Sequence, residues 1–350
     1  MQRIAVLPGD GIGTEVTAAA RTVLDAVTRR HGIELAYDDF DWSCRRYLEH
    51  GAMMPDGGLE QLRPYDAILL GAVGWPGVPD HVSLWGLLIP IRRTFRQYVN
   101  LRPIRVFEGV GSPLRDAGAV DFVVVRENVE GEYSEIGGRF NRGFPDEMAV
   151  QESVFTRAGV SRIADYALTL ARGRRSYLTW ATKSNGIVHT MPFWDEVLAE
   201  RAAAFPDVRT DREHIDALAA KLVLQPGRFD VIVASNLFGD ILSDLAAAVA
   251  GSIGIAPSAN LDPTRTFPSM FEPVHGSAPD IAGQGLANPV GAIWSAALML
   301  EHLGHPAAAA DVLRAVERSL ADPAGRTRDL GGEADTAAAV RAVVGHLSGS

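Results

Sequence analysis

The 350-residue sequence predicts an α/β fold, in which a mostly parallel sheet is covered by helices on both faces. Short β-branched stretches alternate with longer stretches of helical periodicity from one end of the chain to the other. The expected strands are 4–7, 67–70, 122–125, 177–180 and 231–234. The clearest helical stretches are 15–29, 162–172 and 193–204, followed by alanine-rich helices at 289–304, 307–321 and 335–347. The length exceeds what one hydrophobic core usually supports, so two lobes are expected.

The composition excludes several classes of protein. With 47% hydrophobic and 22% charged residues, the chain is neither disordered nor fibrous. It has no apolar run long enough to span a membrane, and a net charge of −10 argues against nucleic acid as the main ligand. A single cysteine, Cys44, cannot form an intrachain disulfide. Because a strand-like segment stands where a signal peptide would, we expect a cytoplasmic protein.

A glycine-rich segment, Gly-Asp-Gly-Ile-Gly at 9–13, follows the first strand and opens a helix. One interpretation is a Rossmann dinucleotide loop, but the third glycine comes one residue too early for that pattern. The acid expected about 20 residues further on is also poorly placed, because Glu34 opens the next strand-like run. The sequence therefore favours a tight strand-to-helix turn with positive φ angles.

Two carboxylates, Asp240 and Asp244, follow the buried strand 231–234 at a spacing of four residues. On a helix they lie on one face, where their repulsion is relieved if a cation sits between them. Carboxylate oxygens past the end of such a strand suit Mg²⁺ or Mn²⁺. The alternative is that they only complement the helix dipole. Asp216 is a candidate third ligand, although spacing alone does not establish it.

Arginines gather in the segment 91–103, and Arg126 closes the strand 122–125. Guanidinium groups bind carboxylates in a bidentate manner, so convergence of Arg92, Arg102 and Arg126 would form a pocket for a diacid. The alternative for each is a solvated surface arginine, and Arg93 and Arg96 are interpreted in that way.

Two loops after strands carry candidates for proton transfer, Tyr133 and Lys183. Lys183 and Lys221 are the only lysines among 33 basic residues. Neighbouring cations would lower the pKa of Lys183 and make it a useful base, whereas Lys221 is interpreted as a helix-surface residue. The alternative is that both loop residues are inert. Segment 137–152 is predicted to be a projecting hairpin that serves association.

Four segments of this chain resemble the β-decarboxylating dehydrogenases of the isocitrate/isopropylmalate dehydrogenase family. They are Leu-Pro-Gly-Asp-Gly-Ile-Gly at 7–13, Asn-Leu-Arg-Pro at 100–103, and the longer segments 236–244 and 272–283. The resemblance implies a two-lobed fold that is not Rossmann. One lobe would comprise 1–98 and 251–350, the other 99–250, and the hairpin 137–152 would be the arm that joins two subunits.

The resemblance also implies a role for individual residues. Arg92, Arg102 and Arg126 would bind substrate, and Tyr133 and Lys183 would transfer protons. Lys183 and Asp216 would enter the site from the partner subunit of a homodimer with shared active sites, so that Asp216, Asp240 and Asp244 hold Mg²⁺ or Mn²⁺. NAD would bind through the residues His275, Gly276, Ser277, Ala278, Asp280, Asn288 and Asn185. By the same resemblance, family members that use NADP carry lysine and tyrosine at the positions of Asp280 and Ile281, so we expect NAD to be the cofactor of this chain. A K⁺ requirement is left open.

The segment 80–90 indicates the substrate. By the same resemblance, Gly86 and Leu88 occupy the positions at which isocitrate enzymes carry serine and asparagine. Trp85 occupies the position at which isopropylmalate enzymes carry a glutamate. The segment resembles the branch that acts on tartrate and D-malate, with Trp85 and Leu88 beside the substrate's C3 position. Leu87 and Pro90 depart from that branch. The expected activity is NAD- and metal-dependent oxidation and decarboxylation of D-malate (to pyruvate and CO₂) or tartrate. The alternatives are 3-isopropylmalate or another 3-substituted malate as substrate, and a non-catalytic dimeric binding protein.

Overall fold

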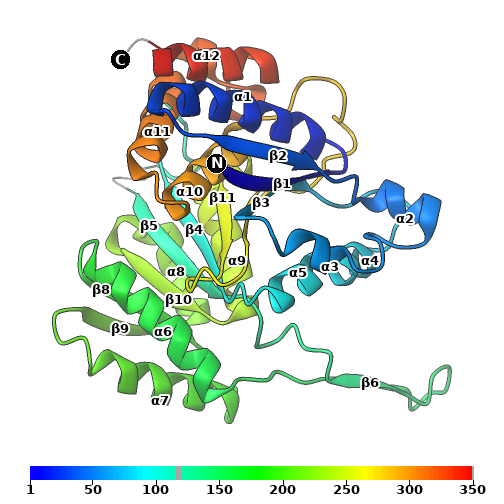
Figure 1. Cartoon of the computed structure of the whole chain (residues 1–350). Helices are drawn as coiled ribbons and strands as arrows, with labels where there is room; N and C mark the ends of the chain where they lie inside the picture. Colours follow the sequence, from blue (N-terminus) through cyan, green and yellow to red (C-terminus); the bar gives the residue numbers. More distant parts are fainter. Residues whose placement is uncertain (116–119, 349–350) are drawn as a thin grey trace.

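One ten-stranded sheet runs through the molecule (Figure 1). The structure, a computed structural model, describes residues 1–115 and 120–348, so 116–119 of the expected middle lobe and 349–350 of the expected large lobe lie outside it. In spatial order the strands are β2 (Leu35–Asp39), β1 (Gln2–Gly9), β3 (Ala67–Ala72), β12 (Ser269–Pro273), β11 (Pro257–Leu261), β4 (Val99–Arg105), β5 (Asp121–Glu127), β10 (Val231–Ala234), β8 (Tyr177–Thr182) and β9 (Arg209–His214).

The sheet is parallel at both ends and antiparallel in the middle. β11 runs antiparallel to both β12 and β4, and β4 runs antiparallel to β5. All five predicted strands are present, as parts of β1, β3, β5, β8 and β10. Of the other five, β2 corresponds to the strand-like run that Glu34 opens. The strands β4, β9, β11 and β12 were missed because their sequences are short or polar: β9, for example, reads Arg-Thr-Asp-Arg-Glu-His and lies at the sheet's edge. The predicted α/β class is correct, and the antiparallel centre is the feature that the sequence did not reveal.

Helices cover both faces of the half of the sheet that contains β1. Side chains alternate along a strand, so Ile4 and Val6 enter one core while Ala5 and Leu7 enter another. The first core lies under α1 (Gly13–His31), α10 (Val290–His302), α11 (Pro306–Ala321) and α12 (Thr336–Ser348). The second lies under α2 (Cys44–His50), α3 (Gly58–Leu62), α4 (Asp80–Ser83), a π-helical turn at Leu84–Leu88 and α5 (Ile89–Thr94).

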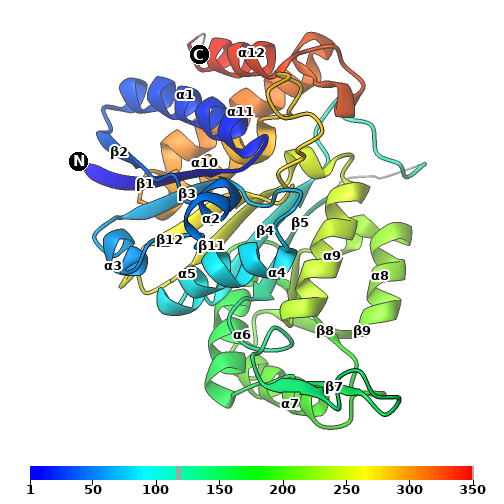
Figure 2. The ribbon, with the colours of Figure 1, turned by 90° about the vertical axis from the view of Figure 1, so that its right-hand side faces the viewer.

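The other half of the sheet is covered in the same way. Figure 2 shows α6 (Arg157–Arg172) and α7 (Thr190–Ala202) on one face, with α8 (Ile215–Leu224) and α9 (Asn236–Val249) on the other. Helix α6 begins where the Thr156 hydroxyl accepts a hydrogen bond from the Gly159 amide, a typical N-cap. Helix α9 packs on β4, β5 and β10, and this contact places its polar face beside the arginines of the middle strands. The connections include the 3₁₀ turns Pro226–Arg228, Ile253–Ile255, Pro323–Gly325 and Arg328–Leu330.

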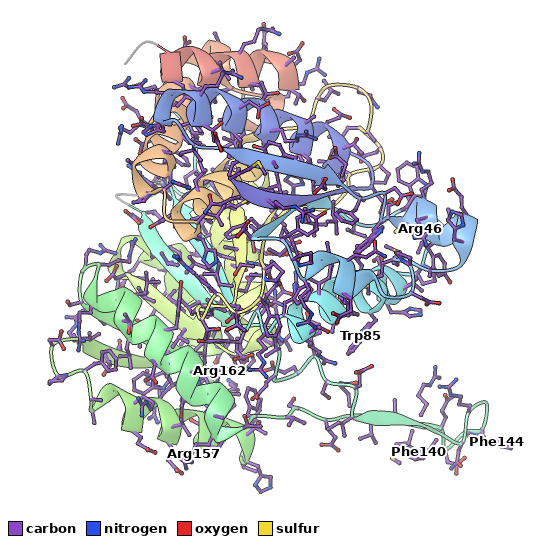
Figure 3. The ribbon with its side chains drawn as sticks, viewed as in Figure 1. Arg46, Trp85, Phe140, Phe144, Arg157 and Arg162 are labelled. Carbon is purple, nitrogen blue, oxygen red and sulfur yellow. The ribbon has the colours of Figure 1, made fainter. Side chains whose placement is uncertain are left out.

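The predicted hairpin is present and projects away from the rest of the molecule. Its antiparallel strands are β6 (Gly137–Phe140) and β7 (Met148–Gln151). Figure 3 shows Phe140 and Phe144 near its tip, and their side chains are 51% and 67% exposed. Within residues 1–115 and 120–348, no helix is long and apolar enough to cross a membrane.

Histidine 302, at the end of α10, predicts one pH-dependent component of stability. Its ring packs against Phe271, and burial lowers its pKa to about 4. In the unfolded chain this histidine is protonated below about pH 6.5, whereas in the folded chain it is protonated only below about pH 4. The free energy of unfolding therefore decreases as the pH falls from 6.5 to 4. In His302→Phe, we expect the decrease in the free energy of unfolding between pH 6.5 and pH 4 to be smaller by about 2–3 kcal/mol. Melting temperatures of the wild-type protein and the variant, measured between pH 4 and 8, check this prediction. Melting temperatures that change with pH in parallel would contradict it.

Candidate functional site

The glycine segment 9–13 forms the tight turn that the sequence favoured. Gly9 and Gly11 have φ angles of 72° and 56°, which suit glycine. A Cβ atom on Gly11 would lie 2.0 Å from the Ser277 carbonyl oxygen, and the Ile12 amide donates to that oxygen at 2.8 Å. The turn therefore supports the 275–280 loop.

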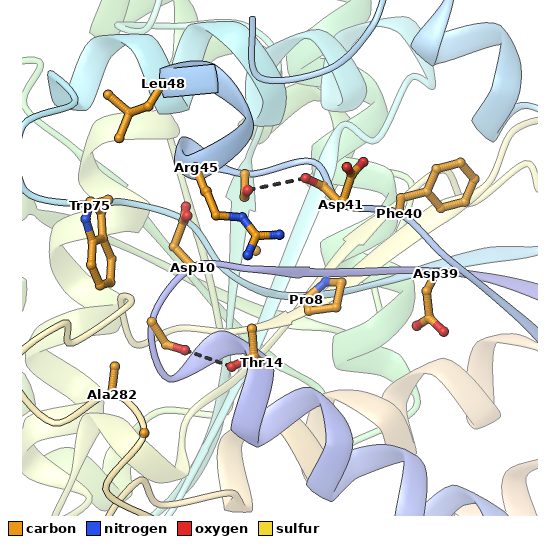
Figure 4. Close-up of a pocket in the computed structure, with 14 residues that line it drawn as sticks. Pro8, Asp10, Thr14, Asp39, Phe40, Asp41, Arg45, Leu48, Trp75 and Ala282 are labelled. Carbon is orange, nitrogen blue, oxygen red and sulfur yellow. Dashed lines mark hydrogen bonds between the residues drawn. The ribbon is translucent and has the colours of Figure 1, made fainter. Parts of the chain in front are cut away.

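A cavity of about 730 Å³ lies on the other side of this turn, a feature that sequence reasoning missed. Figure 4 shows Arg45 and Trp75 facing it from α2 and from the loop after β3. Asp10 lines it, but its carboxylate is occupied by the amides of Cys44 and Gly74.

The middle strands bring the predicted arginines to one face of the sheet. Asn100 is paired with Arg126 across β4 and β5, and Arg102 lies two residues along β4, on the same face. Helix α9 covers this face and presents Asn236, Asp240 and Asp244 at one-turn intervals.

Ion pairs join these strands to the helix. Arg126 donates to the Asn236 side-chain oxygen at 2.7 and 3.0 Å and also binds Asp240. Arg102 lies 3.4 Å from Asp240 and 3.3 Å from Asp244. Both guanidinium groups are almost fully buried, so the carboxylates compensate charge that water does not reach.

Gly239 is a site residue that sequence reasoning missed. A Cβ atom there would lie 2.6 Å from the Arg126 Cβ, which is closer than packed atoms approach. The glycine therefore lets α9 lie directly on the arginine of β5. The signal in the sequence was a glycine inside a helical stretch, where it costs stability unless packing requires it.

Arg92 reaches the same place from α5. Its Nη2 lies 2.7 Å from Glu272 Oε1, and Asn260 donates to that same oxygen at 2.7 Å. The three arginines surround a cavity of about 170 Å³. Its walls are Leu84, Ile89, Arg92, Arg93, Arg102, Arg126, Asn128, Val129, Tyr133, Asn236 and Asp240.

Two predicted substrate residues, Trp85 and Leu88, do not line this cavity; Leu84 and Ile89 do. The reason is the π-helical turn 84–88, which closes with a hydrogen bond from the Ile89 amide to the Leu84 carbonyl. This five-residue closure brings Leu84 and Ile89 to the cavity side. The prediction of Trp85 and Leu88 rested on the resemblance of the segment to the tartrate and D-malate branch, which does not specify this turn. Figure 3 shows Trp85 at the surface of this segment, and its ring lies 5.0 Å from the Arg93 guanidinium carbon.

Tyr133 completes the cavity. Its hydroxyl donates to Asp240 Oδ2 at 2.9 Å, and its ring lies 5.5 Å from the Arg126 guanidinium carbon. The preceding Glu132 was missed by sequence reasoning. Its carboxylate accepts from the Ser235 hydroxyl at 2.7 Å and from the Leu237 amide at 2.9 Å, so it caps α9 with a charge that suits a helix N-terminus.

The charges in the cavity shift several pKa values. Burial disfavours an ionised Asp240, but Arg126 and Arg102 outweigh it and hold its pKa below the ordinary value. Burial raises the pKa of Asp244, against the effect of Arg102. The pKa of Tyr133 is raised by burial and by the Asp240 carboxylate. At neutral pH, Asp240 is therefore an anion and Tyr133 keeps its proton.

Other predicted residues lie outside the cavity within one chain. Lys183 Nζ pairs with Asp216 Oδ1 at 2.8 Å, and Asn185 is exposed on the same loop as Lys183. In the described part of the chain, no three acidic, histidine or cysteine side chains form a group that could hold a metal ion. The predicted set Asp216, Asp240 and Asp244 is thus not assembled by a single subunit.

The loop predicted to bind the dinucleotide directly follows β12. Gly276 and Asp280 are exposed, Ser277 is buried, and Ala278 has a φ of 38°. Burial lowers the pKa of His275, whose Nδ1 lies 2.9 Å from the Gly276 carbonyl oxygen. Asn288 donates to Asp329 at 2.9 Å, so Asp329, which the sequence did not single out, orients it.

Guanidinium groups from three elements, one carboxylate and a phenol around one small cavity define a site for a small polyanionic substrate. The family model for isocitrate/isopropylmalate dehydrogenase matches residues 3–343, so the chain belongs to that family and is an oxidoreductase. The alternative of a non-catalytic binding protein is therefore wrong.

Curated relatives agree over nearly the full length. The chain is 57% identical to the tartrate dehydrogenase/decarboxylase of Pseudomonas putida, covering 95% of this chain and 94% of that protein. It is 56% identical to the decarboxylating D-malate dehydrogenase of Escherichia coli (strain K12), covering 95% of each. The crystal structure of isocitrate dehydrogenase from Methylococcus capsulatus superposes with a TM-score of 0.90 at 35% identity, covering 99% of each chain.

The contact between Gly239 and Arg126 can be tested by Gly239→Ala. Alanine ordinarily stabilises a helix by about 1 kcal/mol over glycine. Here the added methyl group would displace Arg126, so we expect a lower melting temperature and a KM for the substrate raised about tenfold or more. Gly345→Ala is the matched control, because that helical glycine has open space around it and the change should stabilise. Similar behaviour of the two variants would contradict this account.

Proposed function

We propose that this oxidoreductase is an NAD- and divalent-metal-dependent decarboxylating dehydrogenase of malate-type 2-hydroxy diacids, acting on D-malate, which it converts to pyruvate and CO₂, or on tartrate. The observation that carries the proposal is the convergence of Arg92, Arg102 and Arg126 with Tyr133 on one cavity. Paired carboxylates are the ligands that such guanidinium groups select. The names of relatives more than 50% identical to the chain support the same chemistry.

The donor set fits a divalent cation. Asp240 and Asp244 present carboxylate oxygens one helical turn apart, and Mg²⁺ and Mn²⁺ prefer oxygen ligands. Two carboxylates are few for a protein site, which supports a third from a second copy: the partner's Asp216. The cation would stabilise negative charge that develops on the substrate oxygens, and NAD would accept the hydride.

The side chains of this chain would perform the remaining steps. Arg92, Arg102 and Arg126 hold the substrate carboxylates and so orient the C2 hydrogen. The partner's Lys183 accepts the proton of the C2 hydroxyl as that carbon is oxidised. After CO₂ leaves, Tyr133 donates a proton to the carbon that carried it, a role supported by its raised pKa, which keeps the phenol protonated.

A homodimer with shared active sites follows from this division of labour. The hairpin is the element suited to clasping a second subunit, because Phe140, Phe144 and Met148 expose apolar surface on a projecting ribbon.

NAD is favoured over NADP at the 275–280 loop. The Asp280 carboxylate is exposed, and none of the described cations forms an ion pair with it. A carboxylate there can accept hydrogen bonds from ribose hydroxyls and would repel a 2′-phosphate.

A substrate and cofactor panel tests the proposal. With NAD⁺ and Mn²⁺, we expect kcat/KM for D-malate or tartrate to exceed that for 3-isopropylmalate, because Leu84, Ile89 and Val129 leave little room in a cavity of about 170 Å³. Replacing NAD⁺ by NADP⁺ should lower kcat/KM, and EDTA should abolish turnover until Mn²⁺ is restored. A preference for 3-isopropylmalate would establish the alternative substrate, and NADP⁺ preference would overturn the role of Asp280.

The two proton-transfer roles predict different losses. Lys183→Met should abolish oxidation of D-malate, because no base then takes the hydroxyl proton. Tyr133→Phe should mainly slow decarboxylation, by about 10²–10⁴-fold. NADH formation measures the first step, and CO₂ release from added oxaloacetate measures the second. Equal loss of both steps in the tyrosine variant would contradict the assignment.

A further inference from the structure

We propose that Arg93 is a positioning residue that fixes the loop bearing Tyr133 across the cavity, and that Trp85 acts by holding Arg93. The inference rests on the proposed function in one respect, which is that Tyr133 is the proton donor. The sequence had suggested a surface role for Arg93 and a substrate contact for Trp85; the structure assigns both side chains to the support of the catalytic loop.

The guanidinium group of Arg93 makes two hydrogen bonds to that loop. Nη2 donates to the Tyr133 carbonyl oxygen at 2.7 Å, and Nη1 lies 2.8 Å from Glu135 Oε2. Arginine presents these donors in a rigid planar fork, so one side chain holds the Tyr133 backbone carbonyl and the Glu135 side chain of the same loop at once.

Arg93 differs from the other arginines of the cavity in its partners: both of its terminal nitrogens bind the loop that carries Tyr133. Arg102 and Arg126 instead bind α9, and Arg92 binds Glu272. This difference assigns Arg93 to the support of the loop.

The loop is held from the other side by Glu132. Its two carboxylate oxygens bind the Ser235 hydroxyl and the Leu237 amide at the start of α9. Tyr133 therefore lies between two anchors, one on α9 and one on α5. The Tyr133 hydroxyl reaches Asp240 at 2.9 Å, a geometry that depends on both anchors. Loss of the α5 anchor would leave the phenol attached to α9 alone.

Trp85 supports Arg93 from outside the cavity. The π-helical turn directs its ring away from the substrate space, and the ring lies 5.0 Å from the Arg93 guanidinium carbon. An aromatic face in this position attracts the cation and restricts its rotation. The Arg93 side chain is about one-third exposed, so most of it lies against the ring and the loop.

Arg93→Ala tests the inference, with Arg157→Ala as the matched control. Arg157 likewise engages two protein groups, the carboxylates of Glu196 and Glu200 at 2.6 Å each, and has an aromatic ring 5.4 Å from its guanidinium carbon. It lies on α6, away from the cavity. We expect Arg93→Ala to lower kcat for decarboxylation of added oxaloacetate by about ten- to a hundredfold with little change in KM. Arg157→Ala should leave both unchanged.

Two further variants separate positioning from other roles. Arg93→Lys keeps the charge but cannot span both oxygens, so it should recover only part of the rate. In a Tyr133→Phe background, Arg93→Ala should cause no further loss of decarboxylation, because its effect passes through the tyrosine. A rise in KM with kcat unchanged, or an undiminished loss in the double variant, would overturn the proposal.

A measurement independent of turnover completes the test. Amide hydrogen exchange in residues 131–136 should accelerate in Arg93→Ala and, to a lesser degree, in Trp85→Leu, with the dimer content unchanged by gel filtration. Unaltered exchange would overturn the anchoring role. If the wild-type enzyme turns over no malate-type diacid, the proposed function fails. Accelerated exchange in the variants would still establish that Arg93 anchors the loop that carries Tyr133.

Discussion

The contact of buried Arg126 with Asp240 and Asn236 is the interaction on which the rest of the site depends. It places a strand arginine against a helix, and Gly239 makes the approach close enough. Removing one partner of a buried ion pair leaves an uncompensated charge, which costs about 3–5 kcal/mol in proteins generally. Against the effect of burial, Arg126 and Arg102 hold the pKa of Asp240 below its ordinary value. Burial and the Asp240 carboxylate raise the pKa of Tyr133. The stability of the fold, the charge of Asp240 and the proposed binding of substrate therefore depend on the same contact.

The fold was predictable wherever the chain repeats a simple pattern. Strands such as 67–70 and 231–234 are apolar on both faces, and helices such as 15–29 show clear periodicity, so both were found. β4 and β11 were missed because they carry polar residues inward: Asn100 and Asn260 bond each other within the core at 2.9 Å. No local sequence pattern predicts such a pair, because the two asparagines that form this hydrogen bond are 160 residues apart in the chain.

The cavity was predictable to a similar extent. Residue chemistry and family resemblance led to Arg92, Arg102, Arg126, Tyr133 and Asp240, and the structure brings these five together. Glu132 was not singled out and Arg93 was interpreted as a solvated surface residue, because a charged side chain is expected in water until its partners are known. Asp216 and Lys183 lie elsewhere in the single chain, and their predicted role concerns a second copy.

The π-helical turn 84–88 determines which residues of this segment lie beside the cavity, so residues that align in sequence need not lie at the same place in space. Its closing hydrogen bond spans one residue more than that of an α-helix, so the turn changes which side chains line the cavity. Deleting a single residue there would return the segment to α-helical spacing and rotate a different pair of side chains inward, while the strands and arginines stayed in place. Gain or loss of one codon would thus be a short evolutionary route to a new specificity. Positions aligned with a relative that lacks the turn would not be equivalent in space.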